Sequence, residues 1–323
     1  MKYFLTGATG FLGGVLARLL CERGHEVVAL VRSPQKATAL TAMGVTVVTG
    51  DITEMESMRG PMRRCDGVFH AAAWYKVGAR DRSIAWNINV QGTRNILELM
   101  KELRIPKGVY TSTIAVNSNT HGAMPDESFR FTGTHISEYD RTKAAAHDVA
   151  KQFMNDGLPL VTVMPGLIYG PEGTSMSDDA LRLFLRGKLP AIPKGAAFCW
   201  AHVDDTAEAH IRAMESGQTG GSYIIAGPPH PLTEAYTLAA SFIGKRPPLF
   251  LPPAMLRLSS VAASVIETVI PLPAMYSSES LRIQAGVTYL ADSSKARREL
   301  GFSPRPLAVG LEQTIRYELT QLH

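Results

Sequence analysis

The sequence predicts an α/β protein with a doubly wound parallel sheet and a smaller, mostly helical lobe toward the C-terminus. In the first half of the chain, short strands that are apolar almost throughout alternate with helical segments. A glycine-rich turn follows the first strand directly, and prolines gather after residue 165. Strands without polar alternation are typical of a parallel sheet that is covered on both faces, and right-handed crossovers then give a doubly wound order.

This alternation sets the expected elements in order. Strands are expected at Lys2–Thr6, Glu26–Val31, Val45–Val48, Val68–Ala71, Lys107–Ser112 and Leu160–Met164, with Ser222–Ala226 returning to the sheet. Helices are expected at Phe11–Arg23, Pro34–Met43, Ile84–Leu103 and Ser137–Asn155. Gly24 and Gly44 stand where the first two helices should stop, because glycine readily adopts the left-handed conformation of a helix end.

Bulk composition restricts the class of protein. The chain has 323 residues, of which 45% are apolar and 19% charged, and this balance suits a folded domain with an added lobe. The formal charge of +4 is spread without a dense basic block, which argues against a nucleic-acid partner. Three widely spaced cysteines indicate free thiols in a reducing compartment. Since no signal peptide precedes the first strand, we expect a cytoplasmic protein.

Glycines at 7, 10 and 13 stand between the first strand and the first helix, in the stretch Thr6-Gly7-Ala8-Thr9-Gly10-Phe11-Leu12-Gly13. Glycines let the backbone turn sharply and approach a pyrophosphate, and the helix N-terminus supplies N–H donors and a positive dipole end. The strand–turn–helix context therefore predicts a Rossmann-type dinucleotide site, with Thr9, Phe11 and Leu12 among its contacts. We expect this domain at residues 1–166 plus about 198–227, and a substrate-binding lobe at 167–197 plus 228–323.

The end of the second strand favours NADP, with NAD as the alternative. NAD sites place an acidic residue there for the ribose 2′-hydroxyl, whereas NADP sites use an arginine for the 2′-phosphate. This chain has Arg32 and Ser33 at that point and no acid. Asp51 and Ile52, after the third strand, either contact the adenine or serve as a helix cap and a core residue, and both interpretations stay open.

Three side chains form a candidate catalytic set. Tyr139 and Lys143 are four residues apart in an expected helix, so they share one face, and a neighbouring ammonium should lower the pKa of a tyrosine toward neutrality. Thr113 ends the preceding strand, where hydroxyls reach the ligand crevice. It is favoured over Ser112 as the group that holds a substrate oxygen, and Thr111 should contact the cofactor at the same strand end.

These residues resemble those of an extended short-chain dehydrogenase/reductase, the epimerase/dehydratase family. The glycine turn, the Asp51-Ile52 pair and the Thr113/Tyr139/Lys143 set fall in the family's order, and so do four further motifs. They are His70-Ala71-Ala72-Ala73, Asn89-Val90-Gln91-Gly92-Thr93, Pro165-Gly166 with Tyr169-Gly170-Pro171, and His202-Val203-Asp204-Asp205. Within the family the chain resembles dihydroflavonol-reductase-like proteins and, through Ala71–Tyr75 and Ala79-Arg80-Asp81, hopanoid-associated sugar epimerase-like proteins.

The resemblance implies further roles. Ala71, Ala72 and Ala73 should line the cofactor, and Asn89 should support the active-site framework. Pro165, Gly166 and Leu167-Ile168 should lie near the nicotinamide. Thr113 departs from the family's usual serine but keeps the hydroxyl. The resemblance also implies a homodimer paired through the helices near 84–103 and 137–155.

Two features favour a reductase of a ketone or aldehyde with an apolar or aromatic substrate. Phe198 stands where the similar sugar-nucleotide enzymes carry a phosphate-binding arginine, and the stretch Leu249–Met275 is rich in apolar residues. The alternative is an NAD-dependent nucleotide-sugar 4-epimerase or dehydratase, which needs a diphosphate-binding arginine such as Arg182, Arg186 or Arg282. A non-catalytic NADP-binding sensor would have no need for the complete catalytic set.

Two other stretches suggest functions that we do not expect. His202-Val203-Asp204-Asp205 could suggest a metal, but Asp205 followed by Glu208 is typical of a capping box at a helix start, so no metal site is expected. Met255–Met275 is apolar but contains Arg257, Glu267 and two prolines, so we expect no membrane span. A helix that lines a pocket and one that lies on a membrane surface both stay open for this stretch.

Overall fold

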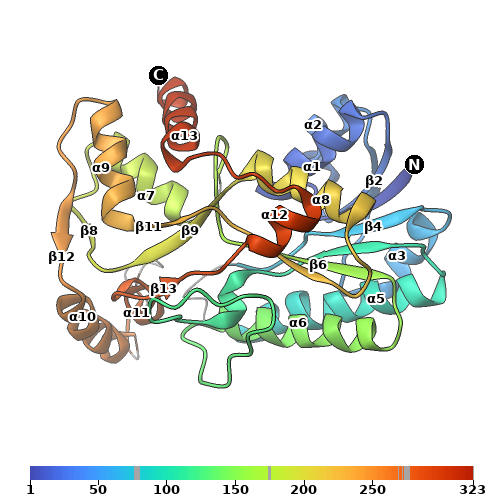
Figure 1. Cartoon of the computed structure of the whole chain (residues 1–323), viewed down its shortest axis with the longest axis horizontal. Coiled ribbons are helices and arrows are strands. Elements are labelled where there is room, and N and C mark those ends of the chain that lie inside the picture. The colour runs from blue at the N-terminus through green and yellow to red at the C-terminus, as the bar shows by residue number, and fades with distance from the viewer. Residues whose placement is uncertain (76–80, 174–175, 268, 271, 273–276, 323) are drawn as a thin grey trace.

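The computed structural model describes residues 1–75, 81–173, 176–267, 269–270, 272 and 277–322. Its centre is a seven-stranded sheet in the order β10-β6-β5-β4-β1-β2-β3, with all neighbours parallel (Figure 1). The strands are β1 (Lys2–Thr6), β2 (Glu26–Val31), β3 (Thr46–Thr49), β4 (Gly67–His70), β5 (Gly108–Thr111), β6 (Leu160–Pro165) and β10 (Ser222–Ile225). The predicted doubly wound sheet is confirmed. Its strand order changes direction at β1, which places a ligand crevice at the carboxyl ends of β1 and β4.

Helices cover both faces of this sheet (Figure 1). One layer holds α1 (Phe11–Glu22), α2 (Thr38–Ala42), α8 (Val203–Ser216) and α12 (Ser294–Leu300). The other holds α3 (Met55–Met62), α4 (Arg82–Trp86), α5 (Gly92–Glu102) and α6 (Glu138–Asn155). Leu16 of α1 and Ile211 of α8 belong to one buried cluster, while Ile96 of α5 and Ala146 of α6 belong to the other. Because both faces are buried, the strands have few polar positions.

The helix boundaries differ from the expected ones in three places. The helix expected at Ile84–Leu103 begins at Arg82 and contains a π-helical turn, η2 (Asn87–Gln91). The segment expected as one helix at Pro34–Met43 is a 3-10 turn, η1 (Pro34–Lys36), followed by α2. Helix α3 was not predicted, since Gly60 and Pro61 weaken its helical signal, yet it buries Met58 and Met62 in the core.

The C-terminal part is largely helical, as expected. Its helices are α7 (Met176–Leu185), α9 (Leu232–Phe242), α10 (Pro253–Ile266), α11 (Ser278–Gln284) and α13 (Leu307–Gln321). None of the described helices is both long and apolar enough to cross a membrane.

Short strands in this part were not predicted, because two to six residues give little periodic signal. A second sheet contains β7 (Leu167–Tyr169), β9 (Ala197–His202), β11 (Pro229–Pro231) and β13 (Thr288–Tyr289). A third pairs β8 (Ala191–Pro193) with β12 (Leu249–Leu251), and a 3-10 turn, η3 (Ile114–Asn117), follows β5. Of the segment 198–227, β10 joins the main sheet as expected, but β9 lies in the second sheet. The proposed domain boundaries stay a prediction.

Candidate active site

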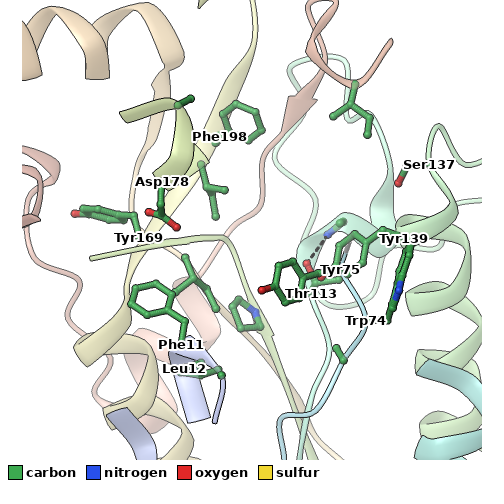
Figure 2. Close-up of a pocket in the computed structure, with 18 of the residues that line it drawn as sticks. Phe11, Leu12, Trp74, Tyr75, Thr113, Ser137, Tyr139, Tyr169, Asp178 and Phe198 are labelled. Atoms are coloured by element: carbon green, nitrogen blue, oxygen red, sulfur yellow. Dashed lines mark hydrogen bonds between the residues drawn. The ribbon is translucent and has the colours of Figure 1, made fainter. Parts of the chain in front are cut away.

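A cavity of about 1480 Å³ opens at the carboxyl ends of the central strands and extends under the C-terminal lobe. Figure 2 shows Tyr139 beside Thr113, with Phe198 and Tyr169 across the cavity. All but two of the predicted site residues line it, and the two exceptions are Ser33 and Asn89. The lining members are Gly7, Thr9, Gly10, Phe11, Leu12, Gly13, Arg32, Asp51, Ile52, Ala71, Ala72, Ala73, Thr111, Thr113, Tyr139, Lys143, Pro165, Gly166 and Ile168.

The glycine turn is a cradle made of backbone. Gly7 has a φ of +78°, and a Cβ there would lie 2.7 Å from the amide nitrogen of Ala72. A Cβ on Gly13 would overlap the carbonyl oxygen of Gly7, so α1 packs against the turn only because residue 13 has no side chain. Gly10 stands at the N-cap of α1. This cradle fits a dinucleotide pyrophosphate, which needs close approach to backbone N–H groups at a helix start.

The expected adenine end of the cavity is formed by the ends of β2 and β3. Arg32 is exposed on the cavity wall and makes no hydrogen bond or ion pair with another residue that the structure describes. Ser33 lies outside the lining, at the N-cap position of the 3-10 turn η1, where its side chain forms no capping hydrogen bond. Asp51 accepts hydrogen bonds from the backbone N (2.9 Å) and Oγ1 (2.8 Å) of Thr53. Ile52 belongs to the buried core, as one interpretation expected, and it also lines the cavity, while its contact with the adenine stays a prediction.

The start of α6 brings the candidate catalytic hydroxyls together. The helix begins after Ser137, whose Oγ accepts a hydrogen bond from the backbone N of Asp140 (3.0 Å). This cap places Tyr139 in the first turn, against the end of β5 (Figure 2). Burial raises the pKa of Tyr139 to about 12, and a hydrogen bond with the Thr113 side chain acts in the opposite direction. Tyr139 is therefore a protonated phenol at neutral pH.

Lys143 does not act on Tyr139 as expected. Its Nζ donates to the carbonyl oxygen of Thr111 (2.8 Å) and to the hydroxyl of Tyr110 (3.3 Å), and it lies 4.9 Å from the centre of the Tyr110 ring. Burial lowers the pKa of Lys143 to about 7. The predicted lowering of the Tyr139 pKa by this ammonium is wrong for the structure described, because β5 holds the lysine and burial dominates both groups.

Two more polar residues keep this geometry in place. The Ser112 hydroxyl forms a hydrogen bond with Nδ1 of His147 (2.8 Å) inside the core, which leaves Thr113 as the hydroxyl beside Tyr139. Asn89 lies behind the cavity wall in the π-helical turn. Its Oδ1 accepts from the backbone N of Trp74 (2.7 Å), and its Nδ2 donates to the carbonyl of Trp74 (3.0 Å) and to Oγ1 of Thr142 (2.9 Å). Asn89 thus ties the loop after β4 to α6.

A buried pair that the sequence did not reveal adjoins the catalytic set. The hydroxyl of Tyr289 donates to Oδ2 of Asp140 (2.9 Å), and burial raises the pKa of Asp140 to about 7. The Tyr289 ring stacks on Phe198 with centroids 6.0 Å apart. Tyr289 lies in β13, far along the chain from α6, and no local motif marks it.

The substrate end of the cavity is apolar in the part of the chain that the structure describes. Its walls include Leu181, Leu189, Ile192, Phe198, Trp200, Leu232, Tyr236, Leu251 and Leu256, together with the buried acid Asp178. Arg32, at the opposite end, is the only arginine among the described lining residues. Arg182 instead forms two hydrogen bonds with the buried Glu318 (2.8 Å each), and Arg282 donates to the carbonyl of Ile136 (3.2 Å). Residues 79–80, 268, 271 and 273–275, which entered the sequence interpretation, lie outside the described residues.

The start of α8 corrects one expectation. His202 is the N-cap, and its Nδ1 accepts a hydrogen bond from the backbone N of Asp204 (3.3 Å). Asp205 is not a cap: it pairs with Arg305, whose Nη2 lies 2.7 Å from Oδ1. The predicted capping box of Asp205 with Glu208 is therefore wrong, because the helix cap lies three residues earlier, at His202.

Comparison with known proteins identifies the family to which this site belongs. The sequence model of the NAD dependent epimerase/dehydratase family matches residues 3–226. The chain belongs to this family. Together with its relatives, this makes the protein an enzyme of the NAD(P)-dependent extended short-chain dehydrogenase type.

Several relatives of this chain are named as reductases. A "Putative dihydroflavonol 4-reductase" of Synechocystis is 34% identical over 69% of this chain and 67% of its own. "Sterol demethylase protein B" of Methylococcus capsulatus is 29% identical over 94% of both chains. A ketoreductase of Stigmatella aurantiaca, named for a farnesyl dihydroquinoline oxide, is 29% identical over 94% of this chain and 92% of its own.

Solved structures share the fold over the whole chain. The crystal structure of gox2253 has a TM-score of 0.85 at 26% identity and covers 99% of this chain and 98% of that one. UDP-glucose 4-epimerase of Thermotoga maritima has a TM-score of 0.80 at 20% identity with full coverage of both chains, which is a likeness of fold.

Proposed function

We propose that this enzyme is an NADP(H)-dependent reductase of a ketone or aldehyde on an apolar or aromatic substrate. The observation that carries the proposal is the pair of hydroxyls of Thr113 and Tyr139 at one point of the cavity. This pair stands between the glycine cradle and an apolar substrate end. The names of the Synechocystis and Stigmatella relatives support a carbonyl reductase.

The chain's own residues supply proton transfer and orientation. When bound, the reduced nicotinamide supplies a hydride with its electron pair to the carbonyl carbon. The Thr113 hydroxyl holds the carbonyl oxygen, and the Tyr139 phenol, protonated at neutral pH, donates its proton to that oxygen and completes the alcohol. Lys143 lies one helical turn further on and provides donors for the nicotinamide ribose. Ala71–Ala73 and Pro165–Ile168 line the cofactor, and Asn89 acts as a positioning residue that fixes the wall behind it.

Two substitutions test the catalytic pair. We expect Tyr139→Phe to lower kcat by at least about 100-fold, the effect of losing a general acid, with little change in dinucleotide affinity. Thr113→Val should lower kcat/KM and leave the fold intact. Tyr317→Phe, on α13 outside the cavity lining, serves as the control and should retain the wild-type rate. Turnover is followed as NADPH oxidation with a panel of aliphatic and aromatic ketones, and a fully active Tyr139→Phe enzyme would contradict the proposal.

The NADP preference rests on Arg32. Its guanidinium is on the cavity wall at the end of β2, where no acid is available to bind a ribose 2′-hydroxyl. We expect Arg32→Gln to weaken NADP⁺ binding by about 10- to 100-fold, the strength of a hydrogen bond to a charged group, and to leave NAD⁺ binding unchanged. Calorimetry with both dinucleotides measures the ratio. NAD that co-purifies and does not exchange would favour the family's epimerase or dehydratase chemistry instead.

We further propose a homodimer paired through α5 and α6. Analytical ultracentrifugation tests this assembly, and a monomeric mass would contradict it.

A further inference from the structure

Helix α10 presents an apolar face to solvent. The residues that form it are Met255 (53% exposed), Leu258 (73%), Val261 (66%), Val265 (65%) and Ile266 (46%). At about 100° per residue, these five positions fall within a stripe roughly 140° wide along the helix. The buried face of α10 holds Leu256, Ala263 and Ser260, whose Oγ donates to the carbonyl of Ser278 (2.8 Å). The helix therefore leaves a second apolar face in solvent, where a surface helix usually has charged and polar residues.

The same segment closes the substrate end of the cavity. Leu256 and Ser259 of α10, and Leu251 at the end of β12, line the cavity from inside. Within β12 itself, Leu249 is 72% exposed and Phe250 39%. Figure 1 shows β12 and α10 together at the end of the lobe farthest from the N-terminus. One thin layer of chain therefore separates an apolar cavity from an apolar exterior.

Basic residues outnumber acidic ones around this surface. Arg257 is the only charged residue of α10. Arg246, before β12, and Lys194, after β8, are exposed, and their side chains form no ion pair with another described residue. The carboxylate of the nearby Glu267 accepts hydrogen bonds from the backbone N (3.0 Å) and Oγ (2.6 Å) of Ser278. With three cations and one carboxylate, the rim of the apolar face carries a net positive charge.

A cationic rim around an apolar stripe matches a bilayer whose headgroups are anionic. Interfacial helices sink their apolar face about 5–10 Å into such a surface, and basic residues at its edge contact the headgroups. A second copy of this chain fits less well, because a two-fold contact through this face would bring the same cations toward one another.

We propose that α10 and β12 form a docking surface for a membrane that contains anionic lipids, on which α10 lies in the plane of the interface. A further consequence rests on the proposed reductase function: an apolar carbonyl substrate dissolved in the bilayer would reach the cavity beside Leu256 without crossing water. The docking itself does not depend on that function.

Co-sedimentation of the full-length protein with vesicles tests the docking. We expect binding to phosphatidylcholine vesicles that contain phosphatidylglycerol, and much weaker binding to phosphatidylcholine alone. Leu258→Glu/Val261→Glu should lower the partition coefficient at least about tenfold, because two apolar groups leave the interface. Arg246→Gln/Arg257→Gln should lower it about fivefold per cation and reduce the dependence on phosphatidylglycerol. Val309→Glu, at an exposed apolar position of α13, is the matched control and should bind like wild type.

Three outcomes would overturn the proposal. They are an absence of vesicle binding at either composition, equal binding by the Leu258→Glu/Val261→Glu variant, and equal losses in that variant and the Val309→Glu control. A fall in molar mass caused by Leu258→Glu/Val261→Glu, without vesicle binding by the wild type, would identify the face as a contact between two copies. The inactive Tyr139→Phe enzyme should still bind vesicles, so a failure of the proposed reductase function would be distinguishable from a failure of docking.

Discussion

Replacing Lys143 by methionine should change how the stability of the protein depends on pH. The side chain is 2% exposed, and burial lowers its pKa from 10.5 to about 7. Between pH 7 and 10.5 the unfolded chain therefore holds a proton that the folded chain has released. The free energy of unfolding of the wild type then rises with pH by up to about 1.4 kcal/mol per unit, or about 5 kcal/mol over the window, relative to a variant without this group.

Urea denaturation at several pH values between 6 and 10, followed by far-UV circular dichroism, measures this difference. Lys143→Met should be stabilised most, relative to wild type, at and below pH 7, and should lose that advantage as the pH rises. Titrations of other groups are common to both proteins and cancel in the comparison. Lys101→Met, an exposed lysine of α5, is the control and should follow the wild-type curve at every pH. A constant difference between wild type and Lys143→Met across the range would refute the assignment of a buried lysine with a lowered pKa.

Three further substitutions distinguish residues that stabilise the fold from residues that bind the ligand. Ser112→Ala should cost about 1–3 kcal/mol of unfolding free energy in urea melts, because it leaves Nδ1 of the buried His147 without its partner, while changing kcat little. Gly13→Ala should abolish measurable dinucleotide binding by calorimetry, since the new methyl group collides with the carbonyl of Gly7, and wild-type affinity would contradict the cradle. Arg182→Met should cost about 3–5 kcal/mol, because a buried carboxylate loses its cation, and should leave KM unchanged; a large rise in KM would instead indicate a role in substrate binding.

Local patterns in the sequence were enough for the central fold. The parallel strands and the glycine turn were predicted with boundaries within one or two residues, because buried strands and a strand–turn–helix junction carry their signal within a few neighbouring residues. The tyrosine and lysine of α6 were identified by their helical spacing together with the position of this helix after the strand that ends in Thr111-Ser112-Thr113. Helix α3 was missed because Gly60 and Pro61 have low helix propensity, so the local sequence gives no helical signal. Packing of Met58 and Met62 in the core stabilises the helix instead.

The sequence by itself determined the family, the sheet and the residues that meet in the cavity. Only the tertiary structure decided the partners of those residues. It shows which strand accepts the hydrogen bond of the Lys143 ammonium, which of Ser112 and Thr113 faces Tyr139, and which carboxylate pairs with Arg182. It also brought Tyr289 to Asp140 and left an apolar stripe of α10 exposed. Each of these depends on burial and on contacts between segments distant in the chain, and neither quantity is encoded in local spacing.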